Sequence, residues 1–330
     1  MKLNKQTLVA VAATALLSGA AMAETGYSFY GRANLSVESQ TTDSGTKSVM
    51  QDNASRLGFR ATRDLPSNLT AGVVLEAGTN LTSGSTKSTF FAREASASLA
   101  GGFGQVKLGR LPASTAYFAT ADFVSNHNHD TGTSSDALYE YLAVGQLSNA
   151  VSYATPKMNG LVMEAQYGLK NGSGTGTSVT DVKVAPVAMS ANYDAGPLQL
   201  GLGYESAEVK NAVGAAITGS QVAARAFYSM GPLGFGGYVQ KSSGTKFDRT
   251  AYRLSAMYTV GQNEFHVNYG SAGDRAGVAN TGAQQATLGY NYNLDKATKI
   301  YGFVTKVNQD SAASYGGDFK SVALGLRYNF

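Results

Sequence analysis

The chain ends on a strict alternation of apolar and small or polar residues. From Ser321 to Phe330 it reads SVALGLRYNF, and every second residue is Val, Leu, Leu, Tyr or Phe. A period of two is typical of a β-strand whose two faces meet different surroundings. The pattern therefore predicts a strand that reaches the last residue.

Alternating segments of this kind recur along the chain, separated by Gly, Asn, Asp and Ser, and no convincing helical stripe intervenes. The sequence predicts an all-β fold of sixteen strands. Their expected ranges are 26–38, 53–63, 69–79, 88–99, 104–110, 146–155, 160–170, 182–194, 198–209, 220–230, 234–242, 249–260, 264–271, 283–294, 298–308 and 319–330.

The connections between these strands alternate in length. Short turns such as DLPSN (64–68), GPL (231–233) and DKA (295–297) alternate with longer polar loops such as NGSGTGTSVT (171–180). Short turns on one rim and long loops on the other are typical of a transmembrane up-and-down barrel. We therefore expect a 16-stranded antiparallel transmembrane β-barrel.

The two faces of the strands differ as lipid and water differ. Leu288, Tyr290 and Tyr292 share one face, whereas glutamine, threonine, glycine and asparagine occupy the other. A soluble barrel is the alternative, but it would place apolar residues inside. Because lipid does not tolerate an open sheet edge, the last strand should close against the first, with 322–330 opposite 27–37 and Phe330 in the interfacial aromatic girdle.

The N-terminus predicts export. Lys2 and Lys5 precede an eleven-residue apolar run at 7–17, and Ala21-Met22-Ala23 is a small-x-small cleavage signature. These features are typical of a signal peptide, whereas a spanning helix needs about 20 apolar residues. The expected organisation is a signal peptide at 1–23 and a single barrel domain at 24–330.

Composition excludes several classes of protein. The chain has no cysteine, so disulfides do not hold it together. Its formal net charge of +4 falls to +2 without the two lysines of the signal peptide, and the charges are scattered. A nucleic-acid partner would require a concentrated basic patch, so none is expected.

The order of several motifs resembles the Gram-negative trimeric porins of the β-proteobacterial type. The motifs are SFYGRANLSV, SRLGFRATRDLPSNLTAGVVLEAG, FFAREASASLAGGFGQVKLGR and AVSYATP. The resemblance implies an outer-membrane homotrimer that contacts lipid and lipopolysaccharide and passes small hydrophilic solutes and ions without a cofactor. It also implies that the terminal Phe330 is read by the barrel-assembly machinery.

The resemblance further implies that the loop at 111–138 folds into the barrel and narrows it. Its composition is unusual, because no Lys or Arg occurs from Leu111 through Pro156. Acidic residues do occur there, at Asp122, Asp130, Asp136 and Glu140. The sequence therefore predicts an acidic constriction loop.

Basic residues are expected on the wall that faces this loop. Alternation directs Arg32, Arg56 and Arg60 inward, and the resemblance adds Arg93 and its acidic partner Glu76. The predicted constriction comprises Arg32, Arg56, Arg60, Arg93, Glu76 and Asp122. Ordinary solvated lumen residues are the alternative. Where relatives often have a further arginine, this chain has Gln146. On the strand that follows Arg93, the polar residues Glu94, Ser96 and Ser98 are expected to face a neighbouring barrel.

The charged residues that are expected to face the lumen include more cations than acids, which favours anions weakly. The predicted inward cations are Arg32, Arg56, Arg60, Lys107, Arg225, Arg249, Arg253 and Arg327. The predicted inward acids are Glu38, Glu76, Glu164, Glu205 and Glu264. We therefore expect a weakly anion-preferring diffusion channel, and a channel specific for phosphate or a small organic anion is the alternative.

Other chemistry has little support in the sequence. His127 and His129 lack a third firm ligand, so no metal site is predicted. An outer-membrane hydrolase would need a nucleophile beside an oriented base, and nothing in the sequence fixes a serine near His266. A surface anchor would need a passenger region, so neither an enzyme nor an anchor is expected.

Overall fold

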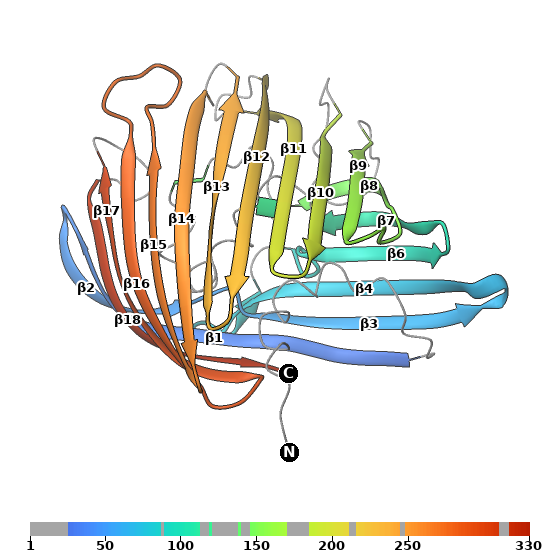
Figure 1. Cartoon of the computed structure of the whole chain (residues 1–330), viewed down its shortest axis with the longest axis horizontal. Helices are drawn as coiled ribbons and strands as arrows, with labels where there is room; N and C mark the ends of the chain where they lie inside the picture. The colour runs from blue at the N-terminus through green and yellow to red at the C-terminus, as the bar shows by residue number, and fades with distance from the viewer. Residues whose placement is uncertain are drawn as a thin grey trace.

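The computed structural model describes residues 26–86, 89–112, 119–120, 138–139, 146–169, 185–210, 216–244, 248–309 and 317–330. It contains eighteen strand segments (Figure 1). They are β1 (Gly26–Thr42), β2 (Gly45–Asp52), β3 (Arg56–Leu65), β4 (Leu69–Asn80), β5 (Ser85–Thr86), β6 (Glu94–Gly101), β7 (Gly104–Pro112), β8 (Gln146–Ala154), β9 (Leu161–Gly168), β10 (Val187–Ala195), β11 (Leu198–Lys210), β12 (Ala216–Met230), β13 (Leu233–Ser243), β14 (Arg249–Val260), β15 (Asn263–Ala272), β16 (Ala283–Asn293), β17 (Thr298–Gln309) and β18 (Phe319–Asn329).

Sixteen of these segments close into one antiparallel ring. Each strand from β6 to β18 pairs with the next in the chain, β4 joins β3 to β6, and β1 joins β18 to β3. β2 continues β3 along the second half of β1, and β5 is a two-residue strand beside the end of β4. The predicted 16-stranded barrel is confirmed. In the described part of the chain, no helix is long and apolar enough to cross a membrane.

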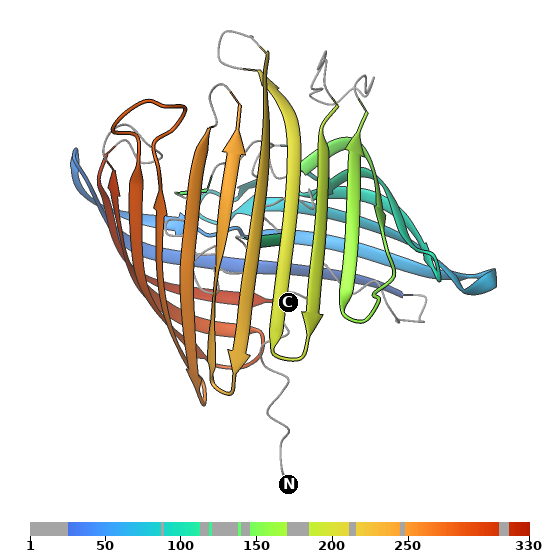
Figure 2. The same ribbon diagram turned by 45° about the horizontal axis from the view of Figure 1, so that its top comes forward.

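The strands stand side by side around the lumen (Figure 2), and short turns join β10 to β11, β12 to β13 and β14 to β15 at one rim. A 3-10 turn at Pro66–Asn68 joins β3 to β4 on the same rim. The C-terminus also lies at this rim, since β18 runs toward it. The short turns predicted from the sequence therefore lie together at one rim of the barrel.

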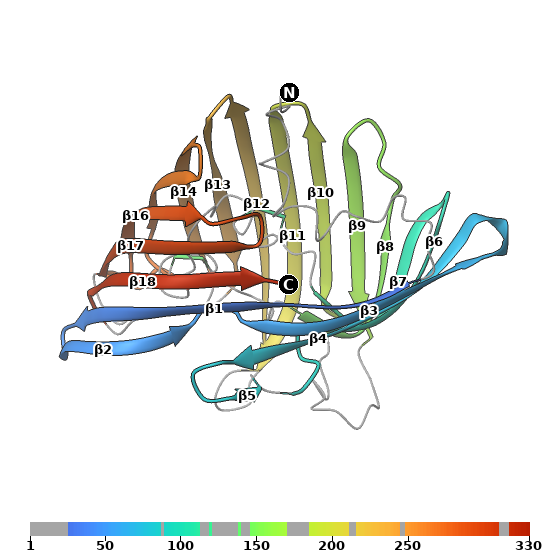
Figure 3. The same cartoon turned by 90° about the horizontal axis from the view of Figure 1, so that it is seen from below.

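The ring closes between β1 and β18, as seen from below in Figure 3. Arg32 lies opposite Asn329, and Thr41 lies opposite Lys320. The predicted register was wrong by a few residues. β1 has 17 residues against 11 in β18, and its residues 26–30 pair with β3 but extend beyond the end of β18. Closure reaches the last residue: Gly31 N–H donates to the backbone oxygen of Phe330 at 2.9 Å, and Phe330 N–H donates to the Gly31 carbonyl at 3.1 Å.

A buried polar cluster interrupts the strand beside this seam. Ala54 adopts a positive φ of 61°, and β2 ends before it while β3 begins after it. The predicted strand 53–63 corresponds to β3, and β2 was not predicted. Asn53 donates from its side chain to Ser36 Oγ at 2.8 Å and to the Tyr301 hydroxyl at 2.9 Å, and its carbonyl accepts from Asn34 at 2.8 Å. These bonds satisfy backbone and side-chain groups that the break would otherwise leave unpaired. They connect β1, the β2–β3 junction and β17.

The strand faces follow the predicted alternation. On β18, Leu324 is 66% exposed, whereas Ser321 is fully buried and Ala323 is 7% exposed. The exposed face is apolar and suits hydrocarbon, while polar side chains fill the lumen side. An inside-out distribution of this kind excludes the soluble-barrel alternative.

Candidate functional site: a charged constriction in the lumen

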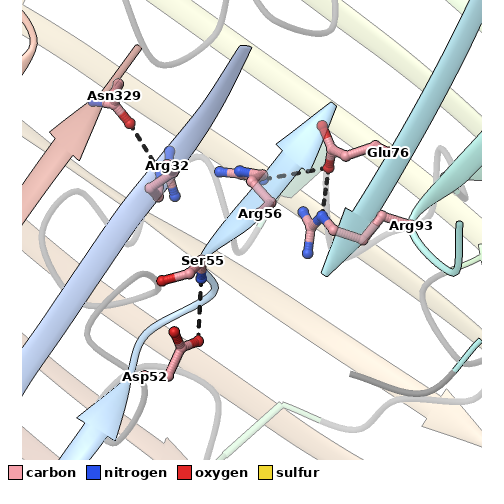
Figure 4. A network of polar contacts seen from close by, with 7 residues as sticks. All are labelled: Arg32, Asp52, Ser55, Arg56, Glu76, Arg93 and Asn329. Carbon is pink, nitrogen blue, oxygen red and sulfur yellow. Dashed lines mark hydrogen bonds and ion pairs between the residues drawn. The ribbon is translucent and has the colours of Figure 1, made fainter. Parts of the chain in front are cut away.

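Two arginines lie directly opposite each other on neighbouring strands. Arg32 on β1 is the cross-strand partner of Arg56 on β3 (Figure 4). Like charges in this position repel each other, so each needs a counter-ligand or water. Arg32 Nε donates to Asn329 Oδ1 of β18 at 3.0 Å, which turns its guanidinium toward the closure seam.

Glu76 on β4 is the acid at the centre of the cluster. Arg56 Nη1 lies 3.9 Å from Glu76 Oε1, and Arg93 Nε donates to the same oxygen. Figure 4 shows both arginines directed toward this carboxylate from two different directions. The side chains keep 15% to 30% of their surface exposed, so the group remains in contact with the lumen.

Arg93 reaches the lumen because it precedes its strand. β6 begins at Glu94, and Arg93 N–H donates to the Glu76 carbonyl at 3.2 Å. Strand alternation does not constrain a residue in the preceding turn, which explains why parity was uninformative for Arg93. The pairing of Arg93 with Glu76 that the resemblance implied is present in the structure.

Arg60 lies four residues after Arg56 on β3 and shares its inward face. Its guanidinium carbon lies 4.4 Å from the centre of the Tyr30 ring. Tyr30 occupies space above Gly58, where an added Cβ would lie 2.3 Å from the ring. A cation held over an aromatic face gains a modest stabilisation, so Tyr30 fixes where the Arg60 charge sits.

The loop after β7 reaches the opposite side of the ring. Arg225 on β12, half-way around the ring from β3, donates to the Ala119 carbonyl. Leu138 packs against alanines of β14, β15 and β16, and the Tyr139 ring lies 5.8 Å from that of Tyr238 on β13. The described residues of this loop therefore lie inside the barrel against the far wall, as predicted.

The acidic residues predicted for the loop lie outside the described residues. They are Asp122, Asp130, Asp136 and Glu140. The histidines His127 and His129 also lie outside the described residues. Asp122 follows Thr120, which is fully buried, by two residues. Its place in the constriction stays a prediction.

The outward placement predicted for one polar row was wrong. Glu94, Ser96 and Ser98 pair with inward residues of β4, and Glu94 Oε1 lies 3.6 Å from Lys107 Nζ. The exposed residues of that strand are Ala97 and Leu99 instead. The prediction failed because it took Arg93 as the reference for inward parity. Glu94 is therefore a lumen acid that the sequence interpretation missed.

Three of the predicted lumen cations are largely buried. Arg225 is 6% exposed, Arg249 is 5% exposed and Arg253 is fully buried. Arg253 donates to Gln285 Oε1 at 2.6 Å, and Arg225 also donates to Asn192 Oδ1 at 3.0 Å. These arginines face inward as predicted. Arg225 ties the loop to the wall, and Arg253 joins strands within the wall. The exposed charge of the constriction comes from the cluster around Glu76.

His266 has neighbours that suit a structural role. Its Nε2 lies 3.6 Å from Glu264 Oε2 and 3.1 Å from Asn291 Nδ2. Among the residues that the structure describes, no group of three or more metal-binding side chains gathers.

Known proteins resemble this chain in sequence and in fold. The family model of the Gram-negative porins matches residues 8–329. Outer membrane porin protein 32 of Delftia acidovorans is 32% identical over 97% of this chain and 94% of its own length. Major outer membrane protein P.IB of Neisseria sicca is 26% identical over 99% and 90%, respectively. The solved anion-selective porin from Comamonas acidovorans has a TM-score of 0.77 and 24% identity, covering 93% of this chain and all of that one. The chain therefore belongs to the Gram-negative porin family and is a β-barrel porin of the outer membrane.

Proposed function

We propose that this porin passes small hydrophilic solutes and ions by diffusion, with a weak preference for anions set by Arg32, Arg56, Arg60 and Arg93. The observation that carries the proposal is the cluster in which Glu76 is the shared partner of Arg56 and Arg93. Four guanidinium groups outnumber the Glu76 carboxylate, and the nearby Glu94 is paired with Lys107, so this wall has a net positive charge. Charges act most strongly on permeant ions where the path is narrow and partly dehydrated.

The infolded loop supports a narrow path through the barrel. Its described residues contact β12 to β16, so the loop crosses from β7 to the far wall. Asp122 and the other loop acids would then oppose the arginine wall. The resulting field is mostly transverse, which orients dipolar solutes and keeps the ion preference modest.

Two further features belong to the proposal. The chain assembles as a homotrimer, by its resemblance to trimeric porins, and one solved structural neighbour is a trimer form of OmpT from Vibrio cholerae. It is exported by a signal peptide that is cut after Ala23, and the barrel-assembly machinery then reads Phe330. Lipid and lipopolysaccharide surround the apolar outer face.

The double variant Arg56→Ala/Arg93→Ala tests the constriction. It removes two positive charges and leaves Glu76 in place, so the reversal potential in a salt gradient should move toward cation selectivity. We expect the anion-to-cation permeability ratio to fall by about threefold or more, which corresponds to roughly 0.7 kcal/mol. The measurement uses single channels in planar bilayers at about 0.1 M salt, where the Debye length is about 10 Å.

Two single variants serve as comparisons for this experiment. Glu76→Gln removes the opposing charge and should shift the ratio toward anions. Lys241→Ala changes a lysine on the outer face that pairs with Asp248 at 2.6 Å, so it should leave the ratio unchanged. An unchanged reversal potential in the double variant would refute the assignment of these arginines.

A further inference from the structure

Arg110 on β7 lies on the outer face of the barrel, in a row that otherwise carries apolar side chains. Leu108, two residues earlier, is 54% exposed, and Ala95, the cross-strand partner of Arg110, belongs to the outward row of β6. β7 begins at Gly104 on the short-turn rim, so Arg110 lies about 20 Å along the strand and about 14 Å in height from that rim. A charged residue at such a depth is costly, and its presence calls for a function.

Two hydrogen bonds hold the Arg110 guanidinium along the outer surface. Its Nε donates to the Ala92 carbonyl at 2.5 Å, and its Nη1 donates to Ser148 Oγ on β8. The side chain therefore connects the turn before β6 to β8, on the other side of β7. The planar fork of an arginine suits this two-point contact, because its donors are fixed relative to one another.

The carbonyl that Arg110 binds belongs to the peptide unit that leads into Arg93. β6 begins at Glu94, so the Ala92 carbonyl lies beyond the start of that strand. The N–H of the same peptide unit, that of Arg93, donates to the Glu76 carbonyl at 3.2 Å. Because a peptide unit is planar, bonds at its carbonyl and at its N–H together fix its orientation. Arg110 holds one end of this unit from outside the barrel, and Glu76 holds the other end from β4.

The orientation of this peptide unit determines where the charge of Arg93 lies in the lumen. Arg93 precedes its strand, so strand alternation does not direct its side chain, and its guanidinium contacts the Glu76 carboxylate that Arg56 shares (Figure 4). A rotation of the peptide plane would turn the Cα–Cβ bond of Arg93 and displace its guanidinium. The effect of a charge on a permeant ion depends on its distance from the path of that ion. A contact on the outer face can therefore set the field inside the channel.

We propose that Arg110 is a positioning residue for ion selectivity, which acts from the outer face by fixing the peptide unit that carries Arg93. The inference rests on the proposed function, because it takes Arg93 as one of the charges that set the anion preference. The two-point fork of Arg110 is the active feature, and its charge is not. A lysine keeps the charge but has one ammonium group on a flexible stem, so it does not replace the fork.

Reversal potentials of single channels in a salt gradient test the proposal in Arg110→Lys. We expect the anion-to-cation permeability ratio to fall by about 1.5-fold or more, because a released Arg93 spreads its charge over more positions. Arg110→Gln, which also loses the charge, should give the same fall. In an Arg93→Ala background, Arg110→Lys should cause no further change, since the two residues act through one group. Lys241→Gln removes an outer-face cation elsewhere and should leave the ratio unchanged.

Hydrogen exchange gives a second readout that does not depend on selectivity. The Arg93 amide should exchange at least about threefold faster in Arg110→Lys than in the unchanged protein, because its peptide unit is then held at one end only. Faster exchange with an unchanged permeability ratio would show that Arg110 merely stabilises the turn, and it would overturn the proposal.

Other outcomes separate this inference from the proposed function. If Arg110→Gln shifts the ratio and Arg110→Lys does not, the charge acts directly across the wall and the inference is wrong, while the constriction stands. If Arg93→Ala alone leaves the ratio unchanged, the proposed constriction fails and the inference fails with it. If Arg110→Lys does not assemble, Ser148→Ala removes one of the two partners and should lower the ratio by a smaller amount. An unchanged ratio in that variant would also overturn the proposal.

Discussion

Leu324→Arg is expected to destabilise the barrel by about 2 to 4 kcal/mol, the cost measured for basic residues at the bilayer midplane. Leu324 is 66% exposed on the outer face of β18. It lies six residues from Phe330, or about 20 Å along the strand and about 14 Å in height, near the middle of the apolar band. The arginine would therefore face hydrocarbon. The free energy of unfolding by guanidinium in lipid vesicles measures the effect.

Two variants on the same face serve as controls. Tyr328→Arg places the same charge near the interface, where the cost falls to about 0 to 1 kcal/mol. Leu324→Ala tests the loss of the side chain alone, and its effect should be small because lipid fills the space. Equal destabilisation by the two arginine variants would contradict the depth assigned to Leu324.

The alternation alone predicts that Ala323→Arg, one residue away, inserts normally. The structure argues against this prediction. Ala323 is 7% exposed and packs with Tyr301 and Phe303, so an arginine there would overpack the lumen wall. A small residue on the water-facing side of a strand is thus not always a free position.

Deletion of Phe330 is expected to reduce the amount of folded barrel in the outer membrane by at least about tenfold. The deletion removes both backbone hydrogen bonds with Gly31, which form the last pair of the closure seam. It also removes the ring that covers Gly31, where an added Cβ would lie 2.4 Å from the ring. Quantification of the heat-modifiable band in outer-membrane fractions measures the result.

Two substitutions separate closure from recognition of the terminal aromatic. Phe330→Tyr keeps the aromatic ring and the backbone, so assembly should be close to normal. Phe330→Ala keeps both backbone bonds and loses the ring, so a defect in this variant is due to the aromatic alone. A deletion variant that assembles as well as Phe330→Tyr would show that the last residue does not close the barrel.

Much of the fold is predictable from the sequence because lipid and water impose opposite demands on alternate residues. The faces of β15, β16 and β18 follow the predicted parity, and the sixteen strands of the ring are those expected. The family comparisons also confirm that the chain is a channel and not an enzyme. Parity fixes the face of a residue, but it carries no information on what else occupies that face.

The unpredicted features arise where tertiary contacts override this pattern. The burial of Arg253 on β14 depends on Gln285 of β16, two strands away, and on the infolded loop, and neither leaves a local signal. The inward direction of Glu94 was missed because the turn at Arg93 resets the alternation. The break at Ala54 depends on bonds from Asn53 to Tyr301, 248 residues away. Contacts at such separations cannot be read from neighbouring residues.

The reversal potential of the unchanged channel in a salt gradient tests the central claim most directly. At about 0.1 M salt we expect anions to be preferred over cations by less than about tenfold, or under roughly 1.4 kcal/mol. The preference should weaken toward 1 M salt, as the Debye length falls from about 10 Å to about 3 Å. A reversal potential of the anion-selective sign that shrinks with salt is the predicted result, and a channel that prefers cations at 0.1 M would contradict the account.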